Sequence, residues 1–356
     1  MASRLILHIG LQKSGTTYLQ EVLTNKVEEL AAAGVVYPLA DRRRRRTENH
    51  EWATYGLLGT EYPWVSAERA ATEQDTWKTM ERRVARTGGT VLLSAEALSA
   101  IRTPAIQLLI DRLGVDDVEV VVTARSLSRS LPSLWQQHVR NGRCLGFERY
   151  LGMLEDQRRL PAARIEEERD LHLWRAFTLG RLVRRWARVV GSARVHVVTS
   201  PGSPPHLLWS RFCEAIGLPV LSGGPDDILD RPVHTGLTAS EALVLTSVNA
   251  ALERTGWDPQ PARRLREAIL TEGFQPRTER GPRIAIPSHW RARVARWSTE
   301  DVTELHDSGV TLIGALTDLC SEPDRDDRRQ PTAEEIGAAG AAAVLVAAHQ
   351  NRAGRR

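Results

Sequence analysis

The sequence predicts an α/β fold, a parallel sheet flanked by helices, followed by a helical C-terminal part. Two observations predict it. Over residues 4–200, apolar runs of strand length alternate with stretches of helical spacing, which is the pattern of a parallel sheet with covering helices. Beyond Pro219 the strand-like runs stop, and apolar residues recur mostly at helical intervals.

Four strands are expected in the first part. The most strand-like run is residues 118–124, a continuous β-branched segment of the kind that is buried on both faces of a parallel sheet. The other three strands are predicted at residues 4–9, 89–94 and 194–199. A short extended piece is expected at 34–38. Residues 40–75 are interpreted as irregular, because they are polar and rich in arginine and aromatic residues.

Helical spacing predicts the remaining elements. One helix is expected at residues 16–33, a helical stretch between the second strand and about residue 113, and further helical stretches between the third strand and residue 190. Beyond these, helices are expected at 206–216, 238–253, 261–270, 290–308 and 310–319. We expect one domain over residues 1–320, with an α/β core at 4–217 and a mostly helical part at 218–320. A charged linker and an alanine-rich helix are expected at 321–356.

Composition excludes several classes of protein. The 356 residues carry a net charge of +4, which is too weak to indicate nucleic-acid binding. Three scattered cysteines favour a reducing compartment over a disulfide framework or a cysteine metal site. The apolar runs at 5–9 and 337–348 are too short for a signal peptide and a membrane span. We therefore expect a cytoplasmic protein with no metal, nucleic-acid partner or integral membrane segment; nothing in the sequence predicts its oligomeric state.

The central motif lies between the first strand and the first helix and reads His8-Ile9-Gly10-Leu11-Gln12-Lys13-Ser14-Gly15-Thr16-Thr17. The backbone N–H groups of Gly15, Thr16 and Thr17 would open the helix, where they have no partner within it and form an anion site with the helix dipole. Lys13 adds a mobile charge. It stands out because only three of the 48 basic residues are lysines.

The same motif argues against an ordinary ATP site. Gly10 and Gly15 have the glycine spacing of the nucleoside-triphosphate loop G-x-x-x-x-G-K-[ST]. Thr16 stands where that loop has its lysine, and Lys13 lies three positions earlier. The strongest strand ends at Arg125, whereas a triphosphatase needs a carboxylate there to hold magnesium. Phosphate or sulfate binding is therefore favoured, and ATP hydrolysis is not.

Lys13-Ser14-Gly15-Thr16-Thr17 after a strand resembles the 5′-phosphosulfate loop of the sulfotransferases, both cytosolic and Golgi-type. This resemblance implies a P-loop-NTPase-like fold and 3′-phosphoadenylyl sulfate (PAPS) as the donor, with no metal. It places Lys13 at the bridging oxygen and the sulfuryl group, and the four following residues around the 5′-phosphate. Tyr18 stands where cytosolic members have a tryptophan against the adenine.

A second motif matches the same family. Its members bind the 3′-phosphate with an arginine that ends a strand and a serine eight residues later, and Arg125 and Ser133 have this spacing. The guanidinium fork suits phosphate. Ser126 follows Arg125 here, where the family has Asp-Pro or Asn-Pro, and Pro132 would interrupt a helix beyond its first turn. Arg129 is an equally available cation. Taken singly, Arg125 would be a surface salt-bridge partner.

Sulfuryl transfer also needs a base for the proton of the acceptor. Glu96 follows the second predicted strand, where the resemblance puts the catalytic histidine of cytosolic members; its ordinary role would be to charge the first turn of a helix. The rival is the segment Glu48-Asn49-His50-Glu51, because Golgi-type members take an acidic base from the region after the first helix. His50 needs the least pKa tuning.

Candidate acceptor-binding residues follow Ser133. Gln137 lies four residues later and hence on the same helix face, whereas His138 is further round; Glu51 is a third candidate. Weaker candidates are the arginine run 42–46, which would draw an anionic acceptor or membrane surface, the segment His234-Thr235, and the tryptophans. The tryptophans in question are Trp52, Trp64 and Trp77.

The sequence thus predicts a PAPS-dependent sulfotransferase that acts on a small-molecule or glycan hydroxyl, or on an amine. Lys13 would stabilise the leaving phosphate and Glu96 would be the favoured base. The alternatives are an ATP-using nucleotide kinase of the P-loop type and a non-catalytic nucleotide-binding protein.

Overall fold

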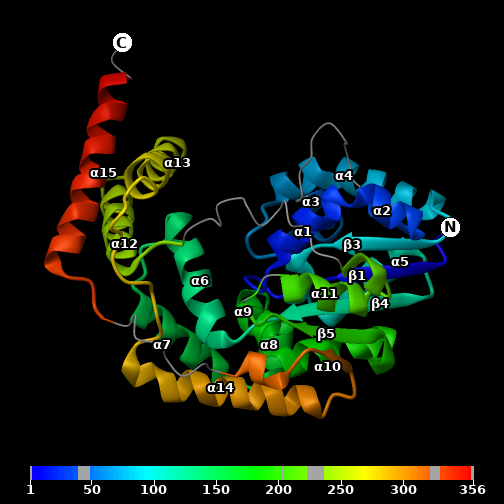
Figure 1. Ribbon diagram of the computed structural model, residues 1–356. Helices are drawn as coiled ribbons and strands as arrows, with labels where there is room; N and C mark the ends of the chain where they lie inside the picture. Colours follow the sequence, from blue (N-terminus) through cyan, green and yellow to red (C-terminus); the bar gives the residue numbers. More distant parts are fainter. Residues whose placement is uncertain are drawn as a thin grey trace. The chain divides into compact units, whose positions relative to one another are not determined.

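The computed structural model describes residues 2–38, 49–202, 204, 206–222, 236–320 and 329–353 (Figure 1). In this part of the chain, one sheet of parallel strands has the order β2-β3-β1-β4-β5-β6. The strands are β1 Arg4–His8, β2 Val35–Val36, β3 Thr90–Ser94, β4 Val118–Ala124, β5 Val195–Thr199 and β6 Thr311–Ile313. The parallel α/β fold and the four strands expected from the sequence are confirmed.

Helices connect and cover these strands. They are α1 Thr16–Asn25, α2 Val27–Ala32, α3 Asn49–Leu58, α4 Ala67–Arg86, α5 Thr103–Leu113, α6 Leu127–Arg140, α7 Phe147–Arg158, α8 Ala162–Glu167, α9 His172–Phe177, α10 Leu179–Val190, α11 His206–Ala215, α12 Ala239–Arg254, α13 Pro259–Ala268, α14 Ser288–His306 and α15 Ala333–Ala353. Short 3₁₀ helices include η1 Gly59–Glu61, η2 Glu96–Ala100 and η8 Leu316–Leu319, and η7 Ile269–Phe274 is a π-helical extension of α13.

Alternate residues of the strands face two separate apolar layers, as the period of two requires. Leu5 and Leu7 face a layer that includes Trp186 of α10, whereas Ile6 faces a layer that includes Phe212 of α11. All of these side chains are fully buried or nearly so. Burial of each is worth about 1.5–3 kcal/mol, so the central strand β1 is held firmly from both sides.

The chain forms two compact units, which we describe separately. Unit 1 comprises residues 1–127, 156–230 and 293–321 and contains the sheet; unit 2 comprises 128–155, 231–292 and 322–356 and is helical in its described part. Both units are discontinuous in sequence. Segment 293–321 belongs with the sheet because it supplies α14 and strand β6.

The structure corrects two secondary-structure predictions. From residue 49 onward, the stretch expected to be irregular is helical: the side chain of Ser66 caps α4 by accepting from the N–H of Arg69, and α4 buries Trp77 and Met80. The polar composition of this stretch made the helical spacing of its few apolar residues hard to recognise in the sequence. The helix expected at 310–319 is instead the edge strand β6 followed by η8, because Gly309 and Gly314 bound a run too short for a helix.

Candidate active site

The loop between β1 and α1 has an unusual backbone at the two positions that carry its chemistry. Lys13 has φ 67°, and it is the only described non-glycine residue with a positive φ. Gly15 has φ 101°, and a Cβ atom added there would lie 2.4 Å from Cδ2 of Leu208. A non-glycine residue in the left-handed region costs about 1–3 kcal/mol and is held only where the surroundings require it. The fold therefore imposes this conformation on Lys13.

Strand β4 anchors the loop. The N–H of Leu11 donates to the carbonyl of Thr123 at 2.7 Å. The hydroxyl of Ser14 donates to the carbonyl of Leu11 at 2.6 Å and is 2.7 Å from the hydroxyl of Thr123. Ser14 is fully buried. Its side chain thus holds the loop together, which differs from the expected contact of Ser14 with the phosphate.

Arg125 joins the same loop from the end of β4. Its Nη1 donates to the carbonyl oxygen of Lys13 at 3.2 Å. The two cationic residues that the sequence singled out, 112 positions apart, are therefore brought together. The cause is the pairing of β1 with β4, which aligns Leu7 with Val120 and sets the ends of the two strands side by side.

The first turn of α1 opens toward this cationic loop. Gly15 is the N-cap residue, and no side chain caps the helix. Thr16 is buried, whereas Thr17 is exposed. Because the first N–H groups of a helix have no partner within it, this end of α1 with Lys13 beside it is suited to a phosphate or sulfate group.

Glu96, the first residue of η2, closes the site two residues after the end of strand β3. The hydroxyl of Thr16 donates a hydrogen bond to Oε2 of Glu96. Removal from water raises the pKa of the Glu96 carboxyl, while the bond from Thr16 and the charge of Lys13 act in the opposite direction. A carboxyl group whose pKa is raised by burial and which lies beside a cation is a typical candidate for a general base.

Beneath the loop lies a buried polar cluster that sequence reasoning did not assign. Nδ1 of His8 is 2.8 Å from the hydroxyl of Ser94, and its Nε2 is 3.2 Å from the hydroxyl of Thr123. Burial lowers the pKa of His8 to about 3, so this histidine is neutral. The cluster connects the ends of β3, β1 and β4 directly under the loop. A histidine as the last residue of a buried strand was the available signal.

His50 is placed differently from what its candidacy as base requires. Its Nε2 lies 2.6 Å from the carbonyl oxygen of Pro38, and its Nδ1 accepts from the N–H of Ser94 at 3.0 Å. Burial lowers its pKa to about 4, so the ring is neutral with the proton on Nε2. Both nitrogens are used within the fold, which weighs against His50 as the base and favours Glu96.

Glu51, in the first turn of α3, contacts the start of η2. Its Oε2 accepts from the N–H of Ala97 at 3.4 Å, and its Oε1 accepts from the hydroxyl of Tyr55 at 2.5 Å. Glu51 is therefore brought next to the backbone that carries Glu96.

Tyr18 packs against the apolar layer that includes α11. Burial is the main cause that raises the pKa of Tyr18, and the charge of Cys213 adds to this effect. Its contact with adenine stays a prediction.

The remaining candidates from the sequence lie on α6 in unit 2. Ser133 and Gln137 are both partly buried, and the ring of His138 meets that of Tyr150 edge-on at 5.5 Å. Pro132 lies inside α6 rather than in its first turn. The pairing of Ser133 with Arg125 and the role of Gln137 in acceptor binding stay predictions. The arginine run 42–46 and His234-Thr235 lie outside the described residues.

The sequence also missed an acid behind Arg125. Asp301 and Ser298 of α14 line a cavity of about 20 Å³ together with Leu11 and Arg125. Asp301 accepts from Nη2 of Arg158 at 2.9 Å, yet burial raises its pKa to about 7. A cavity of this size holds one water molecule. Asp301 lies 176 positions after Arg125, so no local pattern could reveal it.

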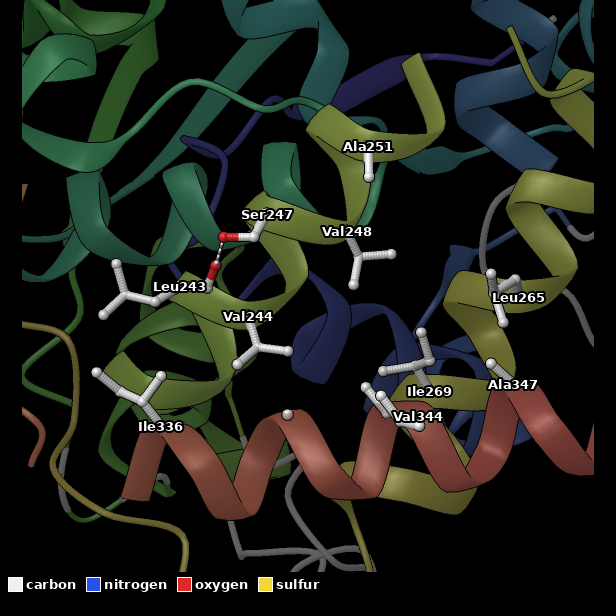
Figure 2. Close-up of a pocket in the computed structure, with 12 residues that line it drawn as sticks. Leu243, Val244, Ser247, Val248, Ala251, Leu265, Ile269, Ile336, Val344 and Ala347 are labelled. Carbon is white, nitrogen blue, oxygen red and sulfur yellow. Dashed lines mark hydrogen bonds between the residues drawn. The ribbon is translucent and has the colours of Figure 1, made fainter. Parts of the chain in front are cut away.

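Unit 2 contains a larger cavity, of about 430 Å³, between α12, α13 and α15 (Figure 2). Its lining is aliphatic apart from Ser247, whose hydroxyl donates to the carbonyl of Leu243 at 3.0 Å. It offers no cation for an anionic donor.

In the described ranges, no helix has the length and apolar character needed to cross a bilayer, and no cluster of His, Cys, Asp or Glu is arranged to hold a metal ion.

Comparisons with known proteins find a likeness to a solved structure. No protein family and no curated protein matches this sequence. A solved structure that resembles the chain is that of a sulfotransferase from Alicyclobacillus acidocaldarius: 15% of the residues are identical, the match covers 74% of this chain and 100% of that one, and the TM-score is 0.41. A likeness at this level assigns neither a substrate nor an activity, so the function is argued from the residues.

Proposed function

We propose that this protein is a sulfotransferase that transfers the sulfuryl group of PAPS to a hydroxyl or amine acceptor. The observation that carries the proposal is the assembly around one loop. Arg125 donates to the backbone of Lys13, and Glu96 accepts from Thr16, in the first turn of the helix that Gly15 caps. Cations, free helix N–H groups and a carboxyl therefore meet at one edge of the sheet.

The donor is proposed to bind with its 5′-phosphosulfate on the first turn of α1. Gly15, Thr16 and Thr17 would hold the phosphate, and Arg125 would take the 3′-phosphate together with Ser133. Ser14 acts through the loop, because its hydroxyl is already bonded to Leu11. A hydrogen bond between a charged group and such a partner is worth about 1.5–3 kcal/mol.

The transfer itself is an in-line displacement at sulfur. The acceptor oxygen forms a bond to sulfur while the bond from sulfur to the bridging oxygen of the 5′-phosphate breaks. The proton of the acceptor passes to Glu96, and the electron pair of the broken bond stays on the phosphate of adenosine 3′,5′-bisphosphate. Lys13 stabilises that charge, an effect worth about 3–4 kcal/mol for a well-placed donor.

Thr16 gives this scheme a switch. A hydroxyl has one proton, so Thr16 cannot donate to Glu96 and to a phosphate oxygen at the same time. In the structure this proton is donated to Glu96. When the donor binds, Thr16 would turn to the phosphate, and Glu96 would become available as the base.

The two alternatives are an ATP-using kinase and a non-catalytic nucleotide-binding protein. A kinase needs a lysine after the second loop glycine and a carboxylate for magnesium, but Thr16 and Arg125 occupy these positions. A protein that only binds nucleotide has no need of a partly buried carboxyl with a raised pKa beside Lys13. Glu96 therefore favours catalysis.

Ligand binding separates these functions. Adenosine 3′,5′-bisphosphate is expected to raise the melting temperature of the protein, and Mg·ATP is not, because only the bisphosphate has a 3′-phosphate for Arg125. Stabilisation by Mg·ATP alone would sink the proposal. Labelled PAPS, incubated with a panel of small-molecule and glycan hydroxyls, then identifies the acceptor. Binding of bisphosphate without transfer to any acceptor would favour the non-catalytic alternative.

A further inference from the structure

A chain of hydrogen bonds runs through the buried cluster beneath the loop between β1 and α1. It begins on α1, where the amide nitrogen of Gln20 donates to the hydroxyl of Ser94 at 3.1 Å. The Ser94 hydroxyl is 2.8 Å from Nδ1 of His8, and Nε2 of His8 is 3.2 Å from the hydroxyl of Thr123. The Thr123 hydroxyl is in turn 2.7 Å from that of Ser14 in the loop. All five side chains are buried, so these groups bond to one another rather than to bulk water.

The direction of this chain follows from the single proton that each hydroxyl carries. The Ser14 hydroxyl donates to the carbonyl of Leu11, and a carbonyl can only accept. Thr123 must therefore donate to Ser14, and Nε2 of His8 must donate to Thr123. Because the ring is neutral, its Nδ1 has no proton and accepts from Ser94. Every donor in the chain thus faces the loop, and His8 is the Nε2–H tautomer.

The chain ends on the turn that carries Lys13. Residues 11–14 form this turn, in which the N–H of Ser14 also donates to the carbonyl of Leu11, at 3.2 Å. Lys13 is the third residue of the turn and has φ 67°. A positive φ at the third position of a turn favours glycine, because a Cβ atom strains the backbone there. The last hydroxyl of the chain therefore closes a turn that a lysine does not favour by itself.

Close packing fixes the His8 ring in this arrangement. The ring of Phe212 meets it edge-on, with the centroids 5.0 Å apart. On the side of the loop, a Cβ atom added at Gly10 would lie 3.0 Å from Nε2 of His8 and 2.6 Å from the hydroxyl oxygen of Thr123. Only a glycine at position 10 lets the backbone pass this close to the chain. The loop is therefore built directly against the donor nitrogen of His8.

We propose that His8 is a positioning residue for sulfuryl transfer: as its Nε2–H tautomer it directs the chain of hydrogen bonds that closes the turn around Lys13. It acts through the loop and not on the substrate. The effect on transfer rests on the proposed function, whereas the direction of the chain and its effect on the turn do not.

The tautomer is measured directly by NMR on the wild-type protein with ¹⁵N-labelled histidine, near neutral pH. Long-range ¹H–¹⁵N correlations distinguish a protonated ring nitrogen from one that only accepts. Contacts with the ring protons of Phe212 identify the signals of His8, so this measurement needs no variant. We expect the proton on Nε2 and none on Nδ1. A proton on Nδ1 would reverse the chain and overturn the inference.

Two variants of His8 differ in which bond of the ring they retain. The amide of His8→Gln is long enough to replace Nε2 as the donor to Thr123, whereas that of His8→Asn reaches only the position of Nδ1. With labelled PAPS, His8→Asn is expected to lower kcat at least about tenfold, with a smaller change in KM, because a misplaced catalytic group is costly. His8→Gln is expected to recover most of that loss. Equal values of kcat in the two variants would reduce His8 to a purely structural residue.

The middle of the chain is tested at Thr123, whose hydroxyl is absent from Thr123→Val and kept in Thr123→Ser. Thr199→Val is the matched control, because Thr199 is equally buried at the end of the neighbouring strand β5 and bonds Asp318 instead. Thr123→Val is expected to lower kcat at least about tenfold, and the other two variants are expected to stay close to the wild-type rate. A Thr123→Val enzyme as fast as Thr199→Val would contradict the inference.

Hydrogen exchange separates this inference from the proposed function. If adenosine 3′,5′-bisphosphate does not stabilise the protein and no acceptor is sulfated, the proposed function falls. The exchange rate of the Ser14 N–H then decides the inference, because this N–H closes the turn. Faster exchange in Thr123→Val than in Thr199→Val supports the effect of the chain on the turn, and equal exchange in the two variants overturns it.

Discussion

The hydroxyl of Thr16 donates to the carboxyl of Glu96, so that one hydrogen bond joins the first turn of α1 to the start of η2. The two residues are 80 positions apart and meet because β1 pairs with β3 in parallel, with His8 opposite Ser94. This contact joins the proposed phosphate site to the proposed base. Because of this contact, the pKa of the Glu96 carboxyl depends on which group accepts the hydrogen bond of Thr16.

Removing the Thr16 hydroxyl is therefore expected to change the acidity of Glu96. The hydrogen bond lowers the pKa of the carboxyl, so Thr16→Val is expected to raise that pKa further. An ionised base is needed for transfer, so the acidic limb of the pH–rate profile should move to higher pH. Thr16→Ser keeps the hydroxyl and serves as the control. If the acidic limb of the pH–rate profile lay at the same pH in both variants as in wild type, Glu96 would not be the base.

Lys13→Ala is expected to lower the rate of sulfuryl transfer by at least about 10²-fold while the protein still folds. The ammonium group has its effect on the charge of the leaving phosphate, and its removal opens no cavity in the core because Lys13 is only partly buried. Lys78→Ala is the matched control, because Lys78 pairs with Asp75 on the surface of α4. Equal rates for the Lys13 variant and wild type, measured with labelled PAPS, would show the proposed mechanism to be wrong.

Lys13→Gly tests whether the loop stores strain. Glycine adopts φ 67° without the cost of a Cβ atom, so this variant is expected to be as stable as wild type or more stable by up to about 1 kcal/mol, although it loses a side chain. Lys78→Gly, inside a helix, is expected to lose about 1 kcal/mol. Urea unfolding of both variants measures the difference. A Lys13→Gly variant that is destabilised as much as Lys78→Gly would refute strain at this position.

The strand–loop–helix unit around Lys13 and the strand that ends before Arg125 were predictable, because apolar runs and the glycine spacing are local signals. The contact of Arg125 with the Lys13 backbone was not, since it depends on the order of strands in the sheet. The burial of His50 was also hidden. It depends on α3 packing against β3, in a segment whose polar composition suggested an irregular chain.

Replacing Gly15 is expected to cost stability in two ways, through backbone strain at a positive φ and through a steric clash of the new Cβ atom. Gly15→Ala would place Cβ 2.4 Å from Leu208 at φ 101°, whereas Gly34→Ala has φ 81° and meets no atom within 4 Å. Both variants are expected to lose about 1–2 kcal/mol from the backbone alone. Gly15→Ala should lose more, because α1 or α11 must shift, and it should also abolish stabilisation by adenosine 3′,5′-bisphosphate. Thermal melts with and without the bisphosphate measure both effects. Retained stabilisation in Gly15→Ala would remove the first turn of α1 from the proposed donor site.

Asp301 predicts how stability depends on pH. Burial raises its pKa to about 7, above the value near 4 of an unfolded aspartate, so the folded protein binds a proton more tightly than the unfolded chain. Its favourable contribution is complete below about pH 4 and is lost as the pH rises to about 7. Charged groups around it are Arg158, which opposes the shift, and Glu300 and Glu304, which add to it.

Asp301→Asn removes this titration. The free energy of unfolding of wild type should therefore fall relative to that of the variant between pH 4 and 8, by a few kcal/mol at most. Arg158 keeps a partner in the variant, because its Nη2 also bonds Glu300 at 3.0 Å. Asp75→Asn, at an exposed position, is the control and should leave the difference flat. Urea unfolding at four pH values measures both. If wild type and Asp301→Asn ran parallel across this range, Asp301 would be ionised throughout, and the acid behind Arg125 would be a permanent anion that offsets the charge of Arg158.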